Sequence, residues 1–418
     1  MRFLLVAAST LALTACGLSG TDTPRDDETA ATTPANDFGY DTYSDQNAAD
    51  TMASDDARYM NASADGSQQD GSGTDIPDSQ ERPIMQAQVV LDRRGFGPGV
   101  VDGKMGMSTT NALRGYQEAN GLTVTGKLDD ATKQSLSDYD RIPATRVVTI
   151  PASWGNQTYT DIPEDTAAKA KMTELGYKSL DERLAERFHT TVAVLKELNP
   201  NGRPAGASTN GASPSPSGSA SASPKPTGSA SPSANASGQT ASFFKAGQQI
   251  RVPNIGADAI SPGEVSEKSW QQTLASLGVG TDQPKVDRIV VSKSKDTLRA
   301  YQGDKLVALF TVSSGSSEFP LPLGEWKILG EAYNPPYSYD PEVLGKSEGK
   351  TYKLPPGPNG PVGVVWIDLS KEHYGIHGTP DPETIGRAQS SGCVRLTNWD
   401  AARLAQMVNT NTDVLFEA

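Results

Sequence analysis

Two short segments near the C-terminus contain the residue types that nucleophilic chemistry needs. Cys393 is one of only two cysteines in 418 residues, and the other, Cys16, lies near the N-terminus. His377 precedes Cys393 by sixteen positions. A thiol that is left free becomes a candidate nucleophile when a histidine can act as its base. The alternative for the same two residues is a buried structural cysteine beside a core histidine.

The residues around Cys393 suit acyl transfer. Gly392 would let the backbone amides of Gly392 and Cys393 approach a developing oxyanion closely. Arg395 carries a permanent charge, which suits a substrate carboxylate or an orienting ion pair. His377 would be either the base or the thiolate partner of Cys393. A Cys–His pair can sit as thiolate and imidazolium, which lowers the thiol pKa well below its free value of about 8.5.

Several β-rich runs must position these residues. Strands are predicted between 288 and 312, with a turn at Gly303-Asp304, and again at 362–368 and 374–377. A helix is predicted over 397–408, where Thr397 and Asp400 form a capping box. The pattern indicates a mainly β domain with a short terminal helix. Strands do not alternate with long helices, which argues against a doubly wound α/β fold.

The two segments resemble the catalytic motif of L,D-transpeptidases of the YkuD type, and the likeness spans about residues 286–417. It implies that Cys393 attacks, that His377 is the base and that the carbonyl of Gly378 orients the imidazole. Oxyanion or orienting roles fall to Gly392, Ser390 and Arg395. The motif residues are Ile376-His377-Gly378-Thr379 and Ser390-Ser391-Gly392-Cys393-Val394-Arg395-Leu396.

Three further features bear on this resemblance. One common version of the motif has histidine where this chain has Ser391, and we expect a change of pocket polarity rather than a loss of catalysis. His373 lies four residues before His377 and is expected at the rim of the site, not as a second base. Residues 355–363 resemble an upstream family segment, and residues 320–326 resemble the family's TPTG turn with both threonines changed to leucine.

The resemblance implies a reaction on peptidoglycan. Cys393 would attack the L-centre carbonyl of meso-diaminopimelate in a tetrapeptide stem and release D-Ala. An amine of another stem would then give a 3–3 cross-link, water would make the protein an L,D-carboxypeptidase, and an amine of a membrane lipoprotein would give a protein–wall bond. The sequence does not choose among these acceptors. A second class is a non-enzymatic lipoprotein that anchors the envelope to peptidoglycan.

No cofactor is expected, because the sequence contains no metal, phosphate or nucleotide motif. A role with nucleic acid has no support, since no basic patch is present. Fourteen acidic side chains and two arginines give residues 17–80 a charge of −12, close to the −13 of the whole chain. The segment 16–80 therefore reads as a disordered acidic tether.

The first fifteen residues are predicted to be a signal peptide. Arg2 precedes an apolar run that is too short to span a bilayer. The run ends in Leu13-Thr14-Ala15-Cys16, which resembles a bacterial lipobox. That resemblance implies lipidation of Cys16 and attachment to a membrane. Gly17 implies the periplasmic side of the outer membrane as the location, in a cell with two membranes.

Two further modules are predicted, so the fold class is multidomain. Residues 81–137 resemble the small, three-helix peptidoglycan-binding domain. Residues 158–255 resemble a split α+β LysM module, of the class that binds glycan, with a Ser/Pro/Ala-rich disordered insertion at 203–242. Ser179 is predicted to cap the first helix of this module, with Glu182 three residues on. His189 is expected to be a surface or core residue rather than a ligand.

Overall fold

The computed structural model describes residues 76–137, 139–207, 241–256, 265–342, 349–387, 390 and 392–418. These residues belong to one compact unit. The predicted signal peptide, Cys16, the tether up to residue 75, most of the 203–242 insertion and Ser391 lie outside the described residues.

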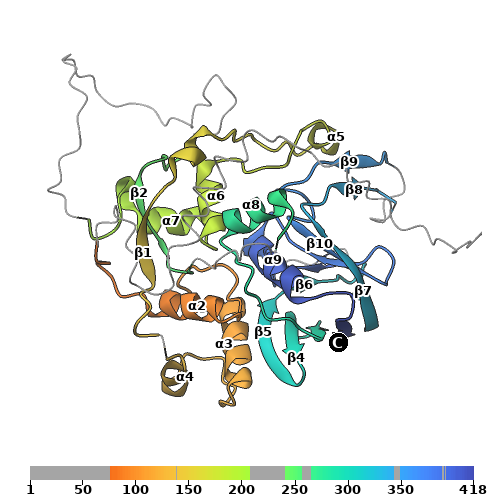
Figure 1. Ribbon diagram of the computed structural model, residues 1–418, viewed down its shortest axis with the longest axis horizontal. Helices are drawn as coiled ribbons and strands as arrows, with labels where there is room; N and C mark the ends of the chain where they lie inside the picture. Colours follow the sequence, from red (N-terminus) through yellow and green to blue (C-terminus); the bar gives the residue numbers. More distant parts are fainter. Residues whose placement is uncertain are drawn as a thin grey trace, which may run out of the picture. The chain divides into compact units, whose positions relative to one another are not determined.

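A nine-stranded sheet carries the C-terminal motifs (Figure 1). Its order is β5-β4-β3-β13-β7-β10-β11-β12-β6. Neighbouring strands are antiparallel, except that β13 runs parallel to β3 and β11 runs parallel to β12. A separate hairpin pairs β8 with β9. The strands are β3 Arg288–Ser292, β4 Thr297–Gln302, β5 Lys305–Thr311, β6 Ser313–Ser314, β7 Gly324–Tyr333, β8 Tyr337–Tyr339, β9 Tyr352–Leu354, β10 Val365–Leu369, β11 Gly375–His377, β12 Val394–Arg395 and β13 Asp413–Glu417.

The predicted mainly β architecture is confirmed, but two of its longer strands were missed. Strand β13 follows the terminal helix and inserts between β3 and β7. Strand β7 begins inside the segment that we predicted as a turn. The terminal helix α9, Asn398–Met407, agrees with the prediction, and the Thr397 hydroxyl accepts the Asp400 amide at 3.1 Å.

Two helices pack on the sheet and close its core. Helix α8, Lys268–Leu277, buries Trp270 and Leu274, and it ends at Gly278, whose φ of 70° lies in the left-handed region. Helix α9 buries Trp399 and Leu404 in the same apolar cluster. Burial of apolar side chains is the main favourable term in folding, and here it fixes α9 beside β10 and beside β11, the strand that ends at His377.

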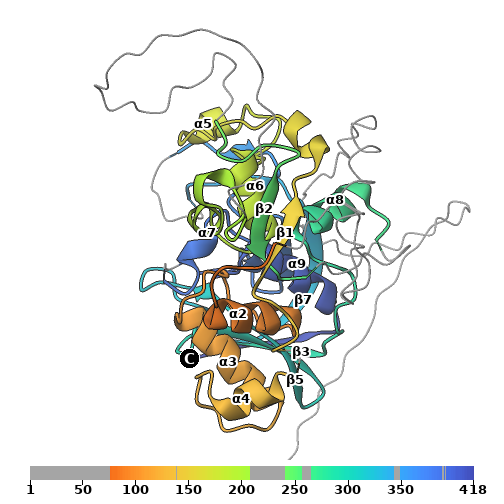
Figure 2. The same cartoon turned by 90° about the vertical axis from the view of Figure 1, so that its left-hand side faces the viewer.

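Three helices precede the sheet, as predicted: α2 Pro83–Arg93, α3 Met107–Ala119 and α4 Asp130–Ser135 (Figure 2). Two buried glutamines, Gln88 and Gln117, hold the following loops in the same way. The Oε1 of each accepts two successive backbone amides, and the Nε2 of each donates to a threonine hydroxyl. Helix α3 lies against β5, and the backbone of Gly95 and Gly97 exchanges hydrogen bonds with Leu309 on that edge strand. This contact covers a strand edge that would otherwise expose unpaired backbone groups.

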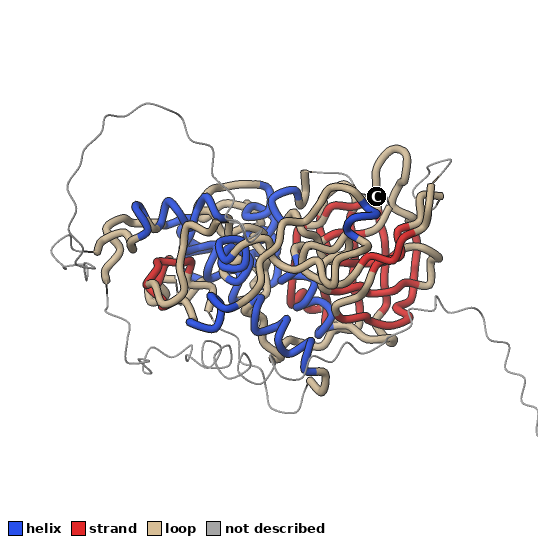
Figure 3. The backbone as a smooth tube through the Cα atoms, turned by 90° about the horizontal axis from the view of Figure 1, so that it is seen from above, coloured by secondary structure: helices blue, strands red, loops and turns tan. Residues whose placement is uncertain are grey.

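A two-stranded module lies between these helices and the sheet in the sequence. Strand β1, Thr145–Thr149, pairs antiparallel with β2, Gln249–Pro253, and forms a sheet of its own (Figure 3). Between them lie α6, Leu180–Arg187, and α7, Val192–Leu198. Strand β1 was not predicted, and it extends this module toward the N-terminus beyond residue 158. The Ser179 cap is confirmed: its hydroxyl accepts the Glu182 amide at 3.1 Å, and Glu182 accepts the Lys178 amide in return.

Short elements complete the described chain. They are η1 Ala152–Asn156, α5 Thr166–Lys169, η2 Pro200–Gly202 and η3 Pro382–Thr384. His189, which follows α6, is fully buried and stacks on Trp399 at 4.8 Å between ring centroids. It is therefore a core residue. Within the described ranges, no helix is both long enough and apolar enough to cross a membrane.

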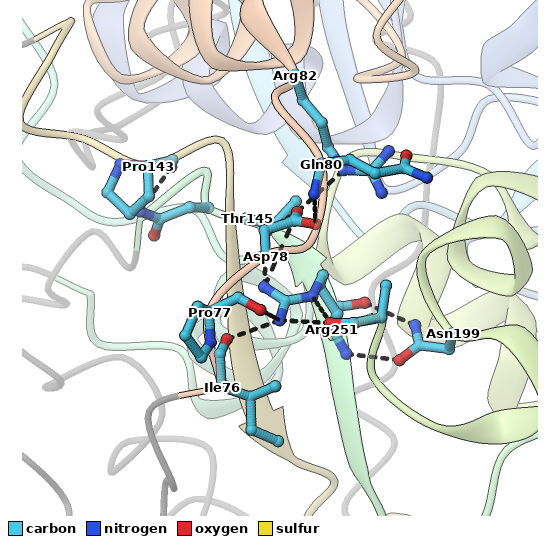
Figure 4. Close-up of polar contacts among 11 residues, drawn as sticks. Ile76, Pro77, Asp78, Gln80, Arg82, Pro143, Thr145, Asn199 and Arg251 are labelled. Carbon is cyan, nitrogen blue, oxygen red and sulfur yellow. Dashed lines mark hydrogen bonds and ion pairs between the residues drawn. The ribbon is translucent and has the colours of Figure 1, made fainter. Parts of the chain in front are cut away.

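Arg251 on β2 holds the segment that begins at Ile76 and leads into α2 (Figure 4). Its guanidinium is almost fully buried and donates to the carbonyls of Ile76, Pro77 and Ala205, and to the Thr145 hydroxyl. Thr145 in turn donates to Asp78 at 2.7 Å. Because every acceptor is a backbone carbonyl or a polar group of a different segment, one side chain joins β1, β2 and the entering chain.

Candidate active site

Strand pairing brings the two predicted segments together. Strand β11 ends at His377, and β12 begins directly after Cys393. The two strands are parallel, with Ile376 opposite Val394 and His377 opposite Arg395. The pairing therefore brings Cys393, at the start of β12, close to β11, two register positions from His377, although sixteen residues separate the two in the chain.

His377 is held as a neutral imidazole. Its Nδ1 donates to the carbonyl of Gly378 at 2.7 Å, because a carbonyl can only accept. The imidazole ring also stacks on the indole of Trp366, with 5.5 Å between the ring centroids. Burial and, to a smaller extent, the charge of Arg395 lower the pKa of His377 to about 4, against the opposing effect of the Gly378 hydrogen bond. The proton is thus on Nδ1, and Nε2 has a free lone pair.

Cys393 is a free thiol that favours its neutral form. Burial raises its pKa, while a backbone hydrogen bond from Gly375 and the charge of Arg395 act to lower it. The Sγ donates to the carbonyl of His373 at 3.7 Å. Desolvation disfavours both the thiolate and the imidazolium, so of the two roles considered for His377 these surroundings favour the base over the thiolate partner.

Ser390 and Gly392 shape the loop that presents Cys393. The Ser390 hydroxyl donates to the Cys393 carbonyl at 2.5 Å and accepts the Gly315 amide at 2.6 Å. Gly392 has a φ of +103°, and a Cβ there would lie 2.6 Å from the Tyr374 ring. This position needs glycine for its backbone angle and for space.

Arg395 interacts electrostatically with both Cys393 and Asp381. Burial lowers the pKa of the Arg395 guanidinium, and the charges of Asp381 and Cys393 raise it. The guanidinium remains charged at neutral pH. It is the cation that the structure places near the thiol.

Several residues of the site were not predicted. Tyr337, on β8, lies close enough to Cys393 that the thiolate charge, after burial, raises the pKa of the phenol. His373 is half-exposed, as expected for a rim residue, yet its carbonyl accepts the thiol proton and its φ is +65°. Asn398, fully buried at the start of α9, touches Gly378. Asn398 could have been suspected from the sequence, because it lies close after the motif that ends at Leu396, whereas nothing near Tyr337 pointed to the site.

The turn at 320–326 lies at the start of β7. The indole nitrogen of Trp326 donates to the Pro322 carbonyl at 2.8 Å. Of the two leucines that replace threonine, Leu321 is buried and Leu323 is 54% exposed. Across the described residues, no group of three or more His, Cys, Asp or Glu side chains could hold a metal ion.

Two family profiles match the chain. The profile described as "L,D-transpeptidase catalytic domain", YkuD, matches residues 286–415. The profile described as "Putative peptidoglycan binding domain" matches residues 80–136. The first range contains the nine-stranded sheet almost entirely, and the second contains helices α2, α3 and α4.

Curated proteins from several bacteria are similar to the C-terminal part. "Putative L,D-transpeptidase YkuD" of Bacillus licheniformis is 33% identical over 174 residues, which are 42% of this chain and 88% of that protein. The Bacillus subtilis protein of the same name is 32% identical over 126 residues, 30% of this chain and 63% of that protein. "Putative L,D-transpeptidase YqjB" of Bacillus subtilis is 29% identical and is covered to 69%.

Solved structures of L,D-transpeptidases are also similar to about a third of this chain. L,D-transpeptidase 3 from Mycobacterium tuberculosis, in complex with a faropenem-derived adduct, has a TM-score of 0.27 and 18% identity over 32% of this chain and 61% of that one. An L,D-transpeptidase from Mycobacterium smegmatis has a TM-score of 0.27 and 22% identity, and 58% of it is covered. The chain thus spans about three-fifths of these two structures.

The family assignment rests on the similarity to the Bacillus licheniformis protein, which covers most of that relative, and on the matching catalytic profile. The chain belongs to the YkuD family of L,D-transpeptidases, and it carries that family's catalytic domain together with a peptidoglycan-binding domain.

Proposed function

We propose that Cys393 is the nucleophile of this L,D-transpeptidase and that His377 is its general base. The observation that carries the proposal is the Nδ1–Gly378 hydrogen bond of 2.7 Å, which fixes the tautomer and leaves Nε2 to take the thiol proton. Since both groups are neutral at rest, the proton moves to His377 as the sulfur attacks, and no thiolate needs to be present beforehand.

The reaction proceeds in two acyl-transfer steps. The sulfur of Cys393 adds to the L-centre carbonyl of diaminopimelate in a tetrapeptide stem, and the carbonyl electrons move to oxygen. The tetrahedral intermediate collapses, the bond to D-Ala breaks and the imidazolium of His377 protonates the leaving amine. An acceptor amine then attacks the thioester, gives up its proton to His377 and releases Cys393 as a thiol.

Two backbone amides and the charge of one arginine could stabilise the oxyanion of the tetrahedral intermediate. The amides of Gly392 and Cys393 belong to the loop that Ser390 ties to Gly315. The charge of Arg395 near the sulfur favours negative charge in the transition state. These roles are proposed from their placement beside the thiol.

The acceptor is proposed to be an amine of a second stem, which gives a 3–3 cross-link. Water would give an L,D-carboxypeptidase, and a lipoprotein amine would give a protein–wall bond. Incubation with disaccharide-tetrapeptide and mass spectrometry of the products separates these cases. A cross-linked dimer with loss of D-Ala supports the proposal, a tripeptide product alone indicates carboxypeptidase activity, and no product at all favours a non-enzymatic anchor. The Cys393→Ala variant is the control for each.

The modules before the catalytic domain are proposed to bind the wall. The helical domain matches a peptidoglycan-binding profile. We propose that the two-stranded module, α6 and α7 between β1 and β2, is a LysM-like glycan binder, because its helix–helix–strand order and its Leu198-Asn199-Pro200 and Gln249–Pro253 segments resemble that class. Sedimentation with purified sacculi, for the chain with and without each module, tests both assignments.

Lipidation of Cys16 is proposed to hold the protein in the cell envelope, on the periplasmic side of the outer membrane. The support is the Leu13-Thr14-Ala15-Cys16 pattern. Cys16→Ser is expected to release the protein into the soluble fraction after enzymatic digestion of the wall. Continued sedimentation with membranes after that digestion would rule the anchor out.

A further inference from the structure

A buried carboxyl group from the two-stranded module reaches the catalytic domain. Glu186 on α6 is 9% exposed, and its Oε1 accepts a hydrogen bond from Asn398 Nδ2 at 2.7 Å. Tyr177 donates its hydroxyl to the same carboxyl group. Glu186 and Asn398 are 212 residues apart in the chain, and Glu186 lies outside the range that matches the catalytic profile.

The Asn398 amide makes three hydrogen bonds, which use both of its donor hydrogens. Its Nδ2 donates to Glu186 and to the Pro358 carbonyl at 3.1 Å, and its Oδ1 accepts the Val364 amide at 3.3 Å. Two acceptors face the nitrogen and a donor faces the oxygen, so only one orientation of the amide satisfies all three partners. The side chain is fully buried, and an amide proton left without a partner there would cost about 1–3 kcal/mol.

The oriented amide packs directly against the backbone that holds the histidine. A Cβ added to Gly378 would lie 2.2 Å from Asn398 Oδ1, and one added to Gly363 would lie 1.9 Å from it. There is no space between this oxygen and the two peptide units. Gly378 is also the residue whose carbonyl accepts the Nδ1 proton of His377. Rotation of the Asn398 amide would therefore displace the acceptor that fixes the imidazole.

We propose that Glu186 is a positioning residue for the catalytic histidine, and that it acts through Asn398 and the Gly378 carbonyl. The inference rests on the proposed role of His377 as the base. It gives the two-stranded module a part in catalysis besides any binding of glycan: docking of α6 completes the support of the imidazole. A general base works only when its lone pair is aimed at the proton, and displacements of about 1 Å can cost about 10²-fold in rate.

The test compares four variants in the full chain. Glu186→Leu removes the acceptor of the Asn398 hydrogen bond. Glu186→Asp shortens the side chain by one methylene and so moves the carboxylate away from Asn398. Glu186→Gln keeps an oxygen that Asn398 can reach. Glu197→Leu, an exposed glutamate on α7 of the same module, is the matched control. Initial rates with disaccharide-tetrapeptide as donor and acceptor give kcat and KM, and thermal unfolding reports folding of each variant.

We expect Glu186→Leu to lower kcat by about tenfold or more while KM stays within about twofold. Glu186→Gln should retain most of kcat, and Glu197→Leu should match the unmodified protein. If Glu186→Leu does not fold, Glu186→Asp decides, with a fall of kcat at constant KM supporting the proposal. The positioning role is overturned if kcat is unchanged in both Glu186→Leu and Glu186→Asp, or if the effect is confined to KM.

The proposed function and this inference fail in different ways. Turnover that survives in Cys393→Ala or His377→Ala would remove the mechanism itself. If those two variants are inactive while the Glu186 variants keep the full rate, the mechanism stands and only the positioning role is wrong.

Discussion

At the scale of single residues, the proposed site suits proton transfer during attack better than a preformed thiolate. Burial raises the pKa of Cys393 and lowers that of His377, since a low-dielectric surrounding penalises both charges. Arg395 disfavours the imidazolium and favours the thiolate, so it does not stabilise the pair as a whole. The thiol and the imidazole are therefore both neutral at rest, beside the charged Arg395.

This neutrality predicts the pH dependence of two different reactions. Alkylation of Cys393 by iodoacetamide needs the thiolate, so its rate should rise with pH through a midpoint above the free-thiol value of about 8.5. Acylation by substrate needs neutral His377, whose pKa is lowered from 6.5 to about 4. As the pH falls, the acylation rate should therefore begin to drop only below pH 6.5, with a midpoint near pH 4. Rapid alkylation that stays constant between pH 6 and 8 would instead show a preformed thiolate.

The backbone at Gly392 supplies a second prediction at this scale. Gly392→Ala should reduce acylation by about 10²-fold or more, because a Cβ at φ +103° would meet the Tyr374 ring at 2.6 Å and displace the thiol. Gly330→Ala is the matched control, since a Cβ there meets nothing within 4 Å. Acylation rates and melting temperatures of both variants check this. Equal activity in the two would mean that the Gly392 backbone does not place Cys393.

At the scale of elements, the sequence predicted local features well and long-range pairing poorly. The caps at Ser179 and Thr397 and the motif strand ending at His377 depend on near neighbours, and the structure has them. Strand β1 pairs with β2 about 100 residues away, and β13 enters the centre of the sheet after a helix. A strand of five residues does not reveal a distant partner by its own sequence.

The candidate site divides in the same way. Cys393, His377 and Gly378 belong to the two segments of one family motif, so their pairing was predictable. Glu186 and Tyr337 reach the site through the packing of other elements, and neither stands in a motif with the catalytic residues. The protonation states were also not predictable, because burial of each group is a property of the whole fold.

The start of α9 offers a prediction about an element. Thr397→Val keeps the shape of the side chain but removes the oxygen that accepts the Asp400 amide. Loss of such a cap costs about 0.5–2 kcal/mol. Because Asn398 is the first residue of this helix, we also expect a lower kcat. Chemical denaturation and kinetics check both effects, with Thr123→Val in an exposed loop as the control. A stability equal to that of the control would show that the cap contributes nothing.

At the scale of the whole molecule, one buried ion pair joins the peptidoglycan-binding domain to the catalytic domain. Arg403 on α9 donates both terminal nitrogens to Asp92 on α2, at 2.9 and 2.8 Å. His189, from the two-stranded module, contacts the same carboxylate at 3.3 Å and donates Nε2 to the Leu277 carbonyl. Burial raises the pKa of Asp92, but Arg403 and His189 together hold it well below its usual range. Three modules thus share one carboxylate.

This junction predicts that the modules unfold together. Asp92→Asn should lower the free energy of unfolding by about 3–5 kcal/mol, because it removes the carboxylate charge that both terminal nitrogens of the buried Arg403 guanidinium bind. Asp92→Leu combined with Arg403→Met should recover part of that loss, since both charges of the pair are then removed. Asp413→Asn, in the ion pair with Lys327 whose side chains are both 63% exposed, is the control and should cost less than about 1 kcal/mol. Urea denaturation of the full chain measures all four proteins. A loss in Asp92→Asn no larger than in the control would mean that the ion pair does not couple the domains, and separate transitions in the unmodified protein would show that they fold independently.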